Sequence, residues 1–99
     1  MKEMTLAQSM LMMRLLMVVR RWHPSPMPAA EMCIKCEYMG LTMVRIHRIK
    51  NNAIDRGLLV STPLKGKAKQ VALTEKGEEF LREVFAGILN DALQGGVEQ

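Results

Sequence analysis

The sequence predicts a mainly α-helical domain with one small β-hairpin, in the order helix, helix, helix, strand, strand, helix. Three observations lead to this prediction. Apolar residues recur at helical spacing in four segments, they alternate along residues 58–73, and proline or glycine separates most of these segments. A chain of 99 residues has room for one domain, so we treat residues 1–99 as a single unit.

The first predicted helix lies in residues 1–22, and Thr5 can cap its first free backbone amides. Its apolar residues occupy more than one face, whereas a surface helix normally has a single apolar stripe. We expect one face to pack in the core and another to contact a partner subunit, unless the first and last helices simply cover each other. Residues 23–28, HPSPMP, end this helix because three prolines cannot continue it.

Two further helices are expected within residues 28–57. The first is short and ends near residue 39, and Gly40 supplies the turn that follows it. The next begins at Thr42, which is a good N-cap residue, and ends before Gly57, a typical C-cap glycine. Aliphatic side chains at helical spacing predict which face of this third helix packs inward, namely Ile46, Ile49 and Ala53.

The periodicity changes after Gly57. Residues 58–62 and 69–73 alternate as strands do, and the basic stretch PLKGKA between them predicts a hairpin over residues 58–73. Thr74 then caps a last helix over residues 74–93, whose broad apolar stripe needs cover. We expect the final GGVEQ to be a frayed tail.

Three short motifs resemble those of a known family. They are MGLTMVRIHRIKNNA at residues 39–53, RGLLV at residues 56–60 and ALTEKGEEFL at residues 72–81. In this order and spacing they resemble the MarR-like transcription regulators, with PadR-like proteins close behind. The resemblance covers about residues 28–85. It implies a winged helix-turn-helix fold, a third helix that reads DNA, and a dimer formed by the terminal helices.

Positive charge is concentrated in the middle third of the chain. Residues 42–70 carry seven basic side chains and one acidic side chain, although the net charge of the whole chain is only +4. A field of one sign favours polyanions such as nucleic acid. In the major groove, arginine pairs with guanine and asparagine with adenine. The candidate DNA-binding residues are therefore Thr42, Arg45, His47, Arg48, Asn51, Asn52, Lys65, Lys67 and Lys69.

These candidates have different expected roles. Arg45 and Arg48 take the leading base-reading or phosphate-binding roles, followed by Asn51. Thr42 and the first amides of the third helix can hold a phosphate. The hairpin lysines can contact flanking phosphates or the minor groove, which positions the protein more than it specifies sequence. A merely solvated surface is the alternative for both groups.

Cys33 and Cys36 form a C-x-x-C pair, which raises the question of a metal or redox site. A zinc site usually needs four ligands, and only His23 and His47 could add to the pair, so we expect no metal and no other cofactor. A thiol switch fits the spacing, although buried structural thiols fit it better. The sequence has no suggestive Ser-His-Asp or Cys-His arrangement, so we expect no enzymatic activity.

The predicted function is that of a dimeric transcription regulator that represses by occupying a palindromic operator. Its partners are double-stranded DNA and a second copy of the chain, and a small-molecule effector has no support in the sequence. The longest apolar run, residues 15–19, cannot cross a bilayer, so we expect a cytoplasmic protein with no membrane partner. The main alternative is a winged-helix protein-interaction module with little or no specific DNA binding.

Overall fold

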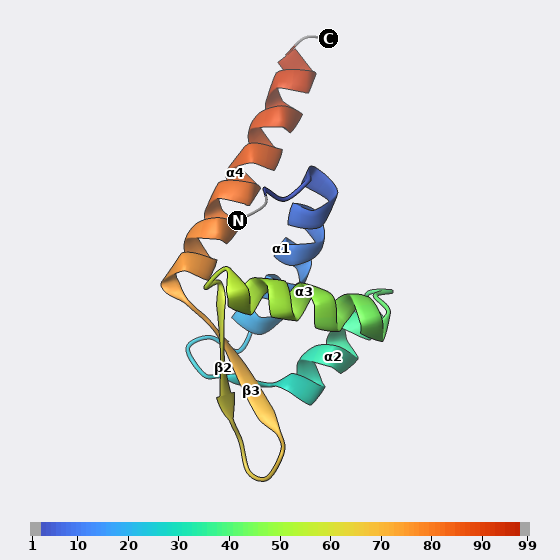
Figure 1. Cartoon of the computed structure of the whole chain (residues 1–99). Coiled ribbons are helices and arrows are strands. Elements are labelled where there is room, and N and C mark those ends of the chain that lie inside the picture. The colour runs from blue at the N-terminus through green and yellow to red at the C-terminus, as the bar shows by residue number, and fades with distance from the viewer. Residues whose placement is uncertain (1–2, 98–99) are drawn as a thin grey trace.

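A computed structural model describes residues 3–97 of the protein, with side chains for residues 3–90. It has four helices, α1 (Leu6–Arg20), α2 (Ala29–Tyr38), α3 (Met43–Asp55) and α4 (Glu75–Val97). Its strands are β1 (Met27–Pro28), β2 (Leu59–Pro63) and β3 (Lys69–Leu73). The mainly α-helical class and the predicted helix-turn-helix and hairpin order are confirmed (Figure 1).

The sheet has three strands, one more than the predicted hairpin. β1 pairs with the free edge of β3, so the order is β1–β3–β2 and both pairings are antiparallel. Met27 lies opposite Val71, and both side chains are buried. Our prediction missed β1 because its two residues lie among prolines. Proline is tolerated here because β1 is an edge strand, and one side of an edge strand makes no ladder hydrogen bonds.

Two predicted helix ends need correction. α1 ends at Arg20, two residues before the expected end, and a turn follows. α4 continues to Val97, so residues 95–97 of the expected frayed tail are helical, while residues 98–99 lie outside the described residues. Glycine lowers helix propensity without forbidding a helix, which is why the two glycines near this end do not stop α4. None of the helices within residues 3–97 is both long and apolar enough to cross a membrane.

Two glycines follow the ends of α2 and α3, namely Gly40, predicted in a turn, and Gly57, predicted as a C-cap. Gly57 has φ +76°, its N–H donates to the carbonyl of Ile54 at 3.0 Å, and the N–H of Leu58 donates to the carbonyl of Ala53 at 2.9 Å. This pattern is a Schellman motif, which needs the left-handed conformation that glycine adopts at low cost. Gly40, with φ +89°, ends α2 in the same way. The turn of the helix-turn-helix and the end of its second helix are therefore set by local hydrogen bonds.

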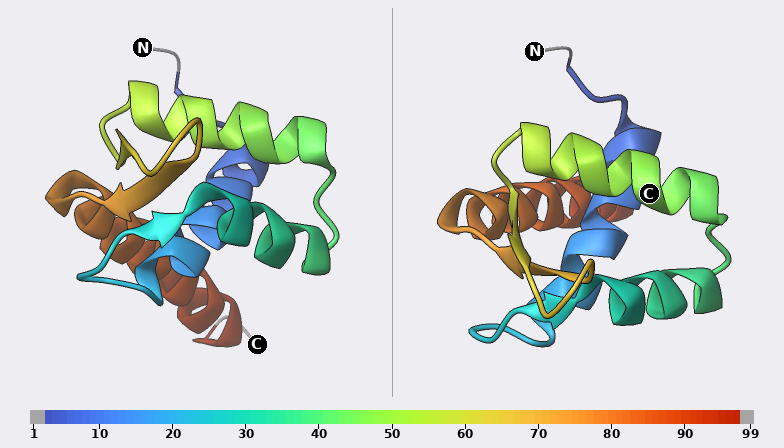
Figure 2. Two further views of the ribbon diagram at one scale, coloured as in Figure 1. Left: turned by 90° about the horizontal axis from the view of Figure 1, so that it is seen from below. Right: turned by 60° about the horizontal axis from the view of Figure 1, so that its bottom comes forward.

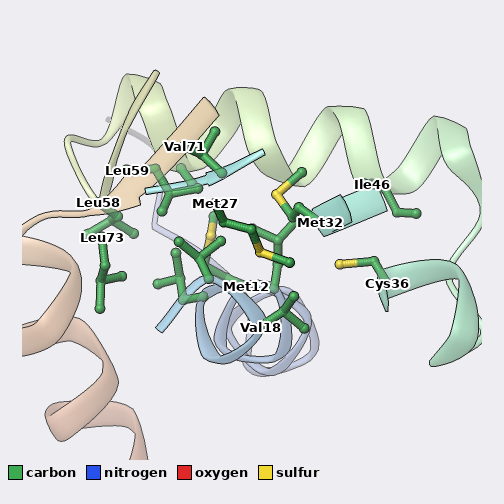
Figure 3. Packing of buried hydrophobic residues seen from close by; sticks show 14 of the residues in the cluster. Met12, Val18, Met27, Met32, Cys36, Ile46, Leu58, Leu59, Val71 and Leu73 are labelled. Atoms are coloured by element: carbon green, nitrogen blue, oxygen red, sulfur yellow. The ribbon is translucent and has the colours of Figure 1, made fainter. Parts of the chain in front are cut away.

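The core is aliphatic and rich in sulfur, as the composition predicts. Figure 3 shows side chains of α1, β1, α2 and the sheet converging between the helices. Met12, Met27, Met32 and Cys36 are at most 1% exposed. Methionine is unbranched and flexible, so it fills the irregular space between elements that cross at different angles.

The junction between β3 and α4 gives a physical reason for LTEKG, residues 73–77, within the third motif quoted above. The hydroxyl of Thr74 donates to the carbonyl of Gly57 at 2.6 Å and accepts from the N–H of Gly77 at 3.0 Å, so it caps α4 as predicted. A Cβ at Gly77 would clash with the carbonyl oxygen of Leu58 and would lie 2.7 Å from Cδ1 of Leu73. α4 can therefore start against the end of α3 only if residue 77 has no side chain.

Alanine substitution at two glycines of α4 should change stability in opposite directions. Gly77→Ala should lower the free energy of unfolding by about 1–3 kcal/mol, because the new Cβ must displace the Leu58 carbonyl. Gly87→Ala has no atom within 4 Å of the new Cβ. It should raise the free energy by about 0.5–1 kcal/mol, because alanine is the better helix former. Urea unfolding of both variants measures this difference, and equal effects would contradict the close approach at Leu58.

Candidate nucleic-acid interface

One face of α3 packs against the body of the protein. Ile46 and Ala53 are fully buried and Ile49 is half-buried, which confirms the predicted inward face. The hydroxyl of Thr42 accepts a hydrogen bond from the N–H of Arg45 at 3.3 Å, so Thr42 caps the helix as predicted. The side chains opposite this face are exposed, and Figure 2 shows that no other helix covers that side of α3.

Three predicted candidates lie on the outward face of α3. Successive residues of a helix are about 100° apart, so the side chains opposite Ile46 and Ala53 can be identified directly. We define the outward face as the exposed residues Val44, His47, Arg48, Asn51 and Asp55. His47, Arg48 and Asn51 are therefore brought together where a partner could contact all of them.

Arg45 and Asn52 lie on the flank of α3 that adjoins α1, not at the centre of the outward face. Arg45 is exposed, whereas Asn52 is half-buried. The Asn52 side-chain oxygen accepts a hydrogen bond from Nε of Arg56 at 2.9 Å. Both residues line a small pocket against α1. Asn52 is thus a poorer candidate for reading bases than Asn51.

Sequence reasoning missed apolar side chains at the N-terminal end of the same helix. Val44 is 68% exposed and belongs to the outward face, and Met43 beside it is also exposed. Apolar groups in this position can contact the methyl group of thymine in the major groove. The signal that could have found them was the helical spacing, because Val44 falls opposite the inward face. Asp55 was likewise overlooked as the one carboxylate on this face.

The hairpin places its lysines in solvent beside α3. Lys65 and Lys67 lie in the tip and Lys69 begins β3, and all three side chains are exposed. The N–H of Leu64 donates to the carbonyl of Ala68 at 2.8 Å and closes the tip. In the left view of Figure 2 the tip and α3 lie on the same side of the molecule. α3 contacts the hairpin through β2, and both carry exposed basic side chains, which we refer to together as the basic surface.

The positive charge of this surface is not neutralised by the side chains that the structure describes. Arg45, Arg48 and the hairpin lysines form no ion pair with any side chain of residues 3–90. The ion pair found there joins Nε of Arg20 to Oε1 of Glu78 at 2.8 Å and ties α1 to α4. The cations are therefore free to pair with an anionic partner.

A solved structure has a similar fold over almost the whole chain. The crystal structure of the "putative transcriptional regulator TA0346" from Thermoplasma acidophilum matches with a TM-score of 0.60 and 19% sequence identity. The match covers 95% of this chain and 98% of that chain. The two proteins share a fold. No family model matches the sequence and no curated protein matches it, so membership of the MarR-like or PadR-like family stays a prediction.

The cysteine pair lies on the inner side of α2. Both thiols are buried, and burial raises the pKa of Cys36 to about 11. Burial also raises the pKa of Cys33, although the nearby charge of Lys50 opposes the shift. A protonated thiol is a poor nucleophile, so these findings favour structural thiols over a thiol switch. Among the described residues, no group of three or more His, Cys, Asp or Glu side chains could hold a metal ion.

Proposed function

We propose that the protein binds double-stranded DNA sequence-specifically and regulates transcription. The outward face of α3 carries this proposal, because it exposes Arg48, Asn51 and His47 together, and neither Arg48 nor His47 forms an ion pair with a described side chain. A helix of this kind fits the major groove of B-DNA. The shared fold with a protein described as a "putative transcriptional regulator" gives independent support.

Each part of the surface has a role in this proposal. α3 would enter the major groove, where Arg48 can pair with guanine, Asn51 with adenine, and Val44 can contact a thymine methyl group. Thr42 and the first amides of α3 would lie near a phosphate. The hairpin lysines would contact flanking phosphates or the minor groove, which positions α3 without adding much sequence information.

The proposed active form is a homodimer built from the terminal helices. α4 projects beyond the rest of the molecule (Figure 1), whose extents are 56 × 27 × 27 Å. Phe85 and Leu89 on this helix are 59% and 55% exposed. A groove of about 590 Å³ runs between α1 and α4 and is lined in part by Met17 and Phe85. A second copy of the chain can cover both features, since it carries the same apolar stripe.

A symmetric dimer would bind a symmetric operator. Its two recognition helices would enter the major groove at half-sites roughly 34 Å apart, one helical turn of DNA. Occupation of such an operator would block access of polymerase to a promoter, so we propose repression as the outcome. This arrangement is also the one that the MarR-like resemblance implies.

Selection from random duplex DNA tests the proposed function. Duplexes bound at two salt concentrations are sequenced, and the mass of the protein in solution is measured in parallel. We expect enrichment of a two-fold-symmetric site by a dimer. Weak binding that disappears at moderate salt, with no enriched motif, would instead favour the protein-interaction alternative.

Replacement of Lys65, Lys67 and Lys69 by glutamine should reduce the salt dependence of DNA binding. The slope of log K against log salt is negative. Every phosphate that the hairpin no longer neutralises should reduce its magnitude by about 0.9, so the magnitude should fall by roughly 1–3. Fluorescence anisotropy over a salt series measures it. The control replaces three exposed cations away from the hairpin, Arg14, Arg21 and Lys76, with glutamine. An equal change of slope in both variants would exclude a specific role for the hairpin.

A further inference from the structure

A small pocket of about 200 Å³ lies between the N-terminal half of α1 and the flank of α3. Its apolar side is formed by Leu11 and Met12 of α1 and Ile49 of α3. Met12 is 1% exposed, and the other two are half-buried. The pocket therefore has an apolar floor and borders the surface proposed to bind DNA.

The remaining lining residues are polar, and the side-chain oxygen of each of the two amides already accepts one hydrogen bond. The side-chain oxygen of Gln8 accepts from the backbone N–H of Thr5 at 2.9 Å. The side-chain oxygen of Asn52 accepts from Nε of Arg56 at 2.9 Å. Because a backbone N–H and a guanidinium can only donate, these bonds identify which amide atom is oxygen. Besides one further lone pair on each oxygen, Gln8 and Asn52 can therefore offer a ligand their NH₂ groups, which are donors.

Arg45 and Arg48 complete the lining and add two positive charges. Among the described residues that line the pocket there is no carboxylate, and donor groups outnumber acceptors, so the lining favours an anionic ligand that accepts hydrogen bonds. One guanidinium can donate two parallel hydrogen bonds to two oxygens of a phosphate, and amide NH₂ groups can donate to the remaining lone pairs. A floor of low polarity strengthens such hydrogen bonds because it keeps water away from them.

We propose that this pocket seats one phosphate group of the DNA backbone, with Gln8 and Asn52 as phosphate-positioning residues. The proposal rests on the proposed DNA-binding function. Arg48 borders both the pocket and the outward face of α3, so a phosphate held here would fix how α3 lies in the groove. Phosphate contacts of this kind set orientation and register while the base contacts specify sequence.

Gln8→Glu tests the seat with little risk to folding. The capping box prefers glutamate or glutamine at this position, so the hydrogen bond from Thr5 is retained while an NH₂ donor becomes a carboxylate oxygen. The control is Ala7→Glu, which adds the same charge at a neighbouring exposed residue that does not line the pocket. Asn52→Asp is a second variant of the same design, because its oxygen can still accept from Arg56.

The readouts are duplex affinity and its salt dependence. We expect Gln8→Glu to bind duplex DNA at least roughly tenfold more weakly than Ala7→Glu, because a charge-assisted hydrogen bond becomes a repulsion. The magnitude of its slope of log K against log salt should fall by about 0.9, which corresponds to one phosphate. Equal affinity and equal slope in the two variants would overturn the seat and leave the proposed DNA binding intact.

A titration with inorganic phosphate separates the two possible sources of the anion. It is followed through the side-chain NH₂ signals of Gln8 and Asn52 in ¹H–¹⁵N spectra at constant ionic strength. If the wild type binds no duplex at all, the proposed function fails, but shifts of both signals would retain the pocket as a seat for free phosphate. Absence of DNA binding together with unmoved NH₂ signals would overturn the seat as well.

Discussion

Arg48→Ala should weaken binding of the selected operator roughly ten- to hundredfold, since a bidentate arginine–guanine pair is worth about 1–3 kcal/mol. Arg48 is exposed on the outward face of α3 and does not belong to the buried core. Its removal should therefore leave the unfolding temperature almost unchanged. The loss should also be specific, so that the base preference at one operator position is relaxed.

Arg45→Ala separates base reading from phosphate binding on the same helix. Because Arg45 lies on the flank beside α1, its loss should weaken binding to all sequences more evenly. It should also reduce the magnitude of the slope of log K against log salt. Arg14→Ala, on the exposed surface of α1, is the matched control for the loss of one arginine. Affinities are measured by anisotropy on the selected operator and on single-base variants of it. Unchanged operator affinity in both α3 variants would remove α3 as the recognition helix.

Replacement of both Phe85 and Leu89 by glutamate should convert the proposed dimer into a monomer. Carboxylates in an apolar interface lose their hydration without gaining partners, which makes association unfavourable. A monomer binds one half-site at a time, so affinity for the full operator should fall by roughly 10²- to 10⁴-fold, the gain that bivalent binding provides. Analytical ultracentrifugation gives the mass, and titration of one-half-site and two-half-site duplexes gives the affinities.

α2 offers a closely matched control for this experiment. Ile34 and Tyr38 have the same i, i+4 spacing as Phe85 and Leu89 and are 52% and 89% exposed. Replacing this pair with glutamate adds the same charge to another exposed apolar pair, and we expect the mass to stay that of a dimer. Dissociation caused only by the α2 pair would move the interface from the terminal helices to α2. A wild-type protein that is monomeric at all concentrations would exclude the dimer.

Several features of the fold could be predicted because they depend on a few neighbouring residues. The Thr42 cap, the Gly40 and Gly57 helix ends and the cap at Thr74 each involve hydrogen bonds over three to five residues. The strands of the hairpin follow from alternating apolar residues, and the inward face of α3 follows from helical spacing. Local rules of this kind operate before any other segment of the chain is in place.

Other features depend on segments that are distant in sequence. β1 is a strand only because β3 supplies its hydrogen-bond partners, so no pattern within HPSPMP could predict it. The need for glycine at residue 77 arises from the carbonyl of Leu58, which the fold brings against α4. Nothing in the residues around either position specifies those neighbours.

The candidate site divides in the same way. The sequence by itself determined that α3 has an apolar inward face and a basic, amide-bearing outward face, because a helix repeats at a constant angle per residue. Only the tertiary structure decided that α1 lies along one flank of α3, which separates Arg45 from the centre of the outward face and brings Gln8 to Asn52. The physical reason is that side-chain direction follows from local backbone geometry, whereas the neighbour that a side chain meets follows from how the whole core packs.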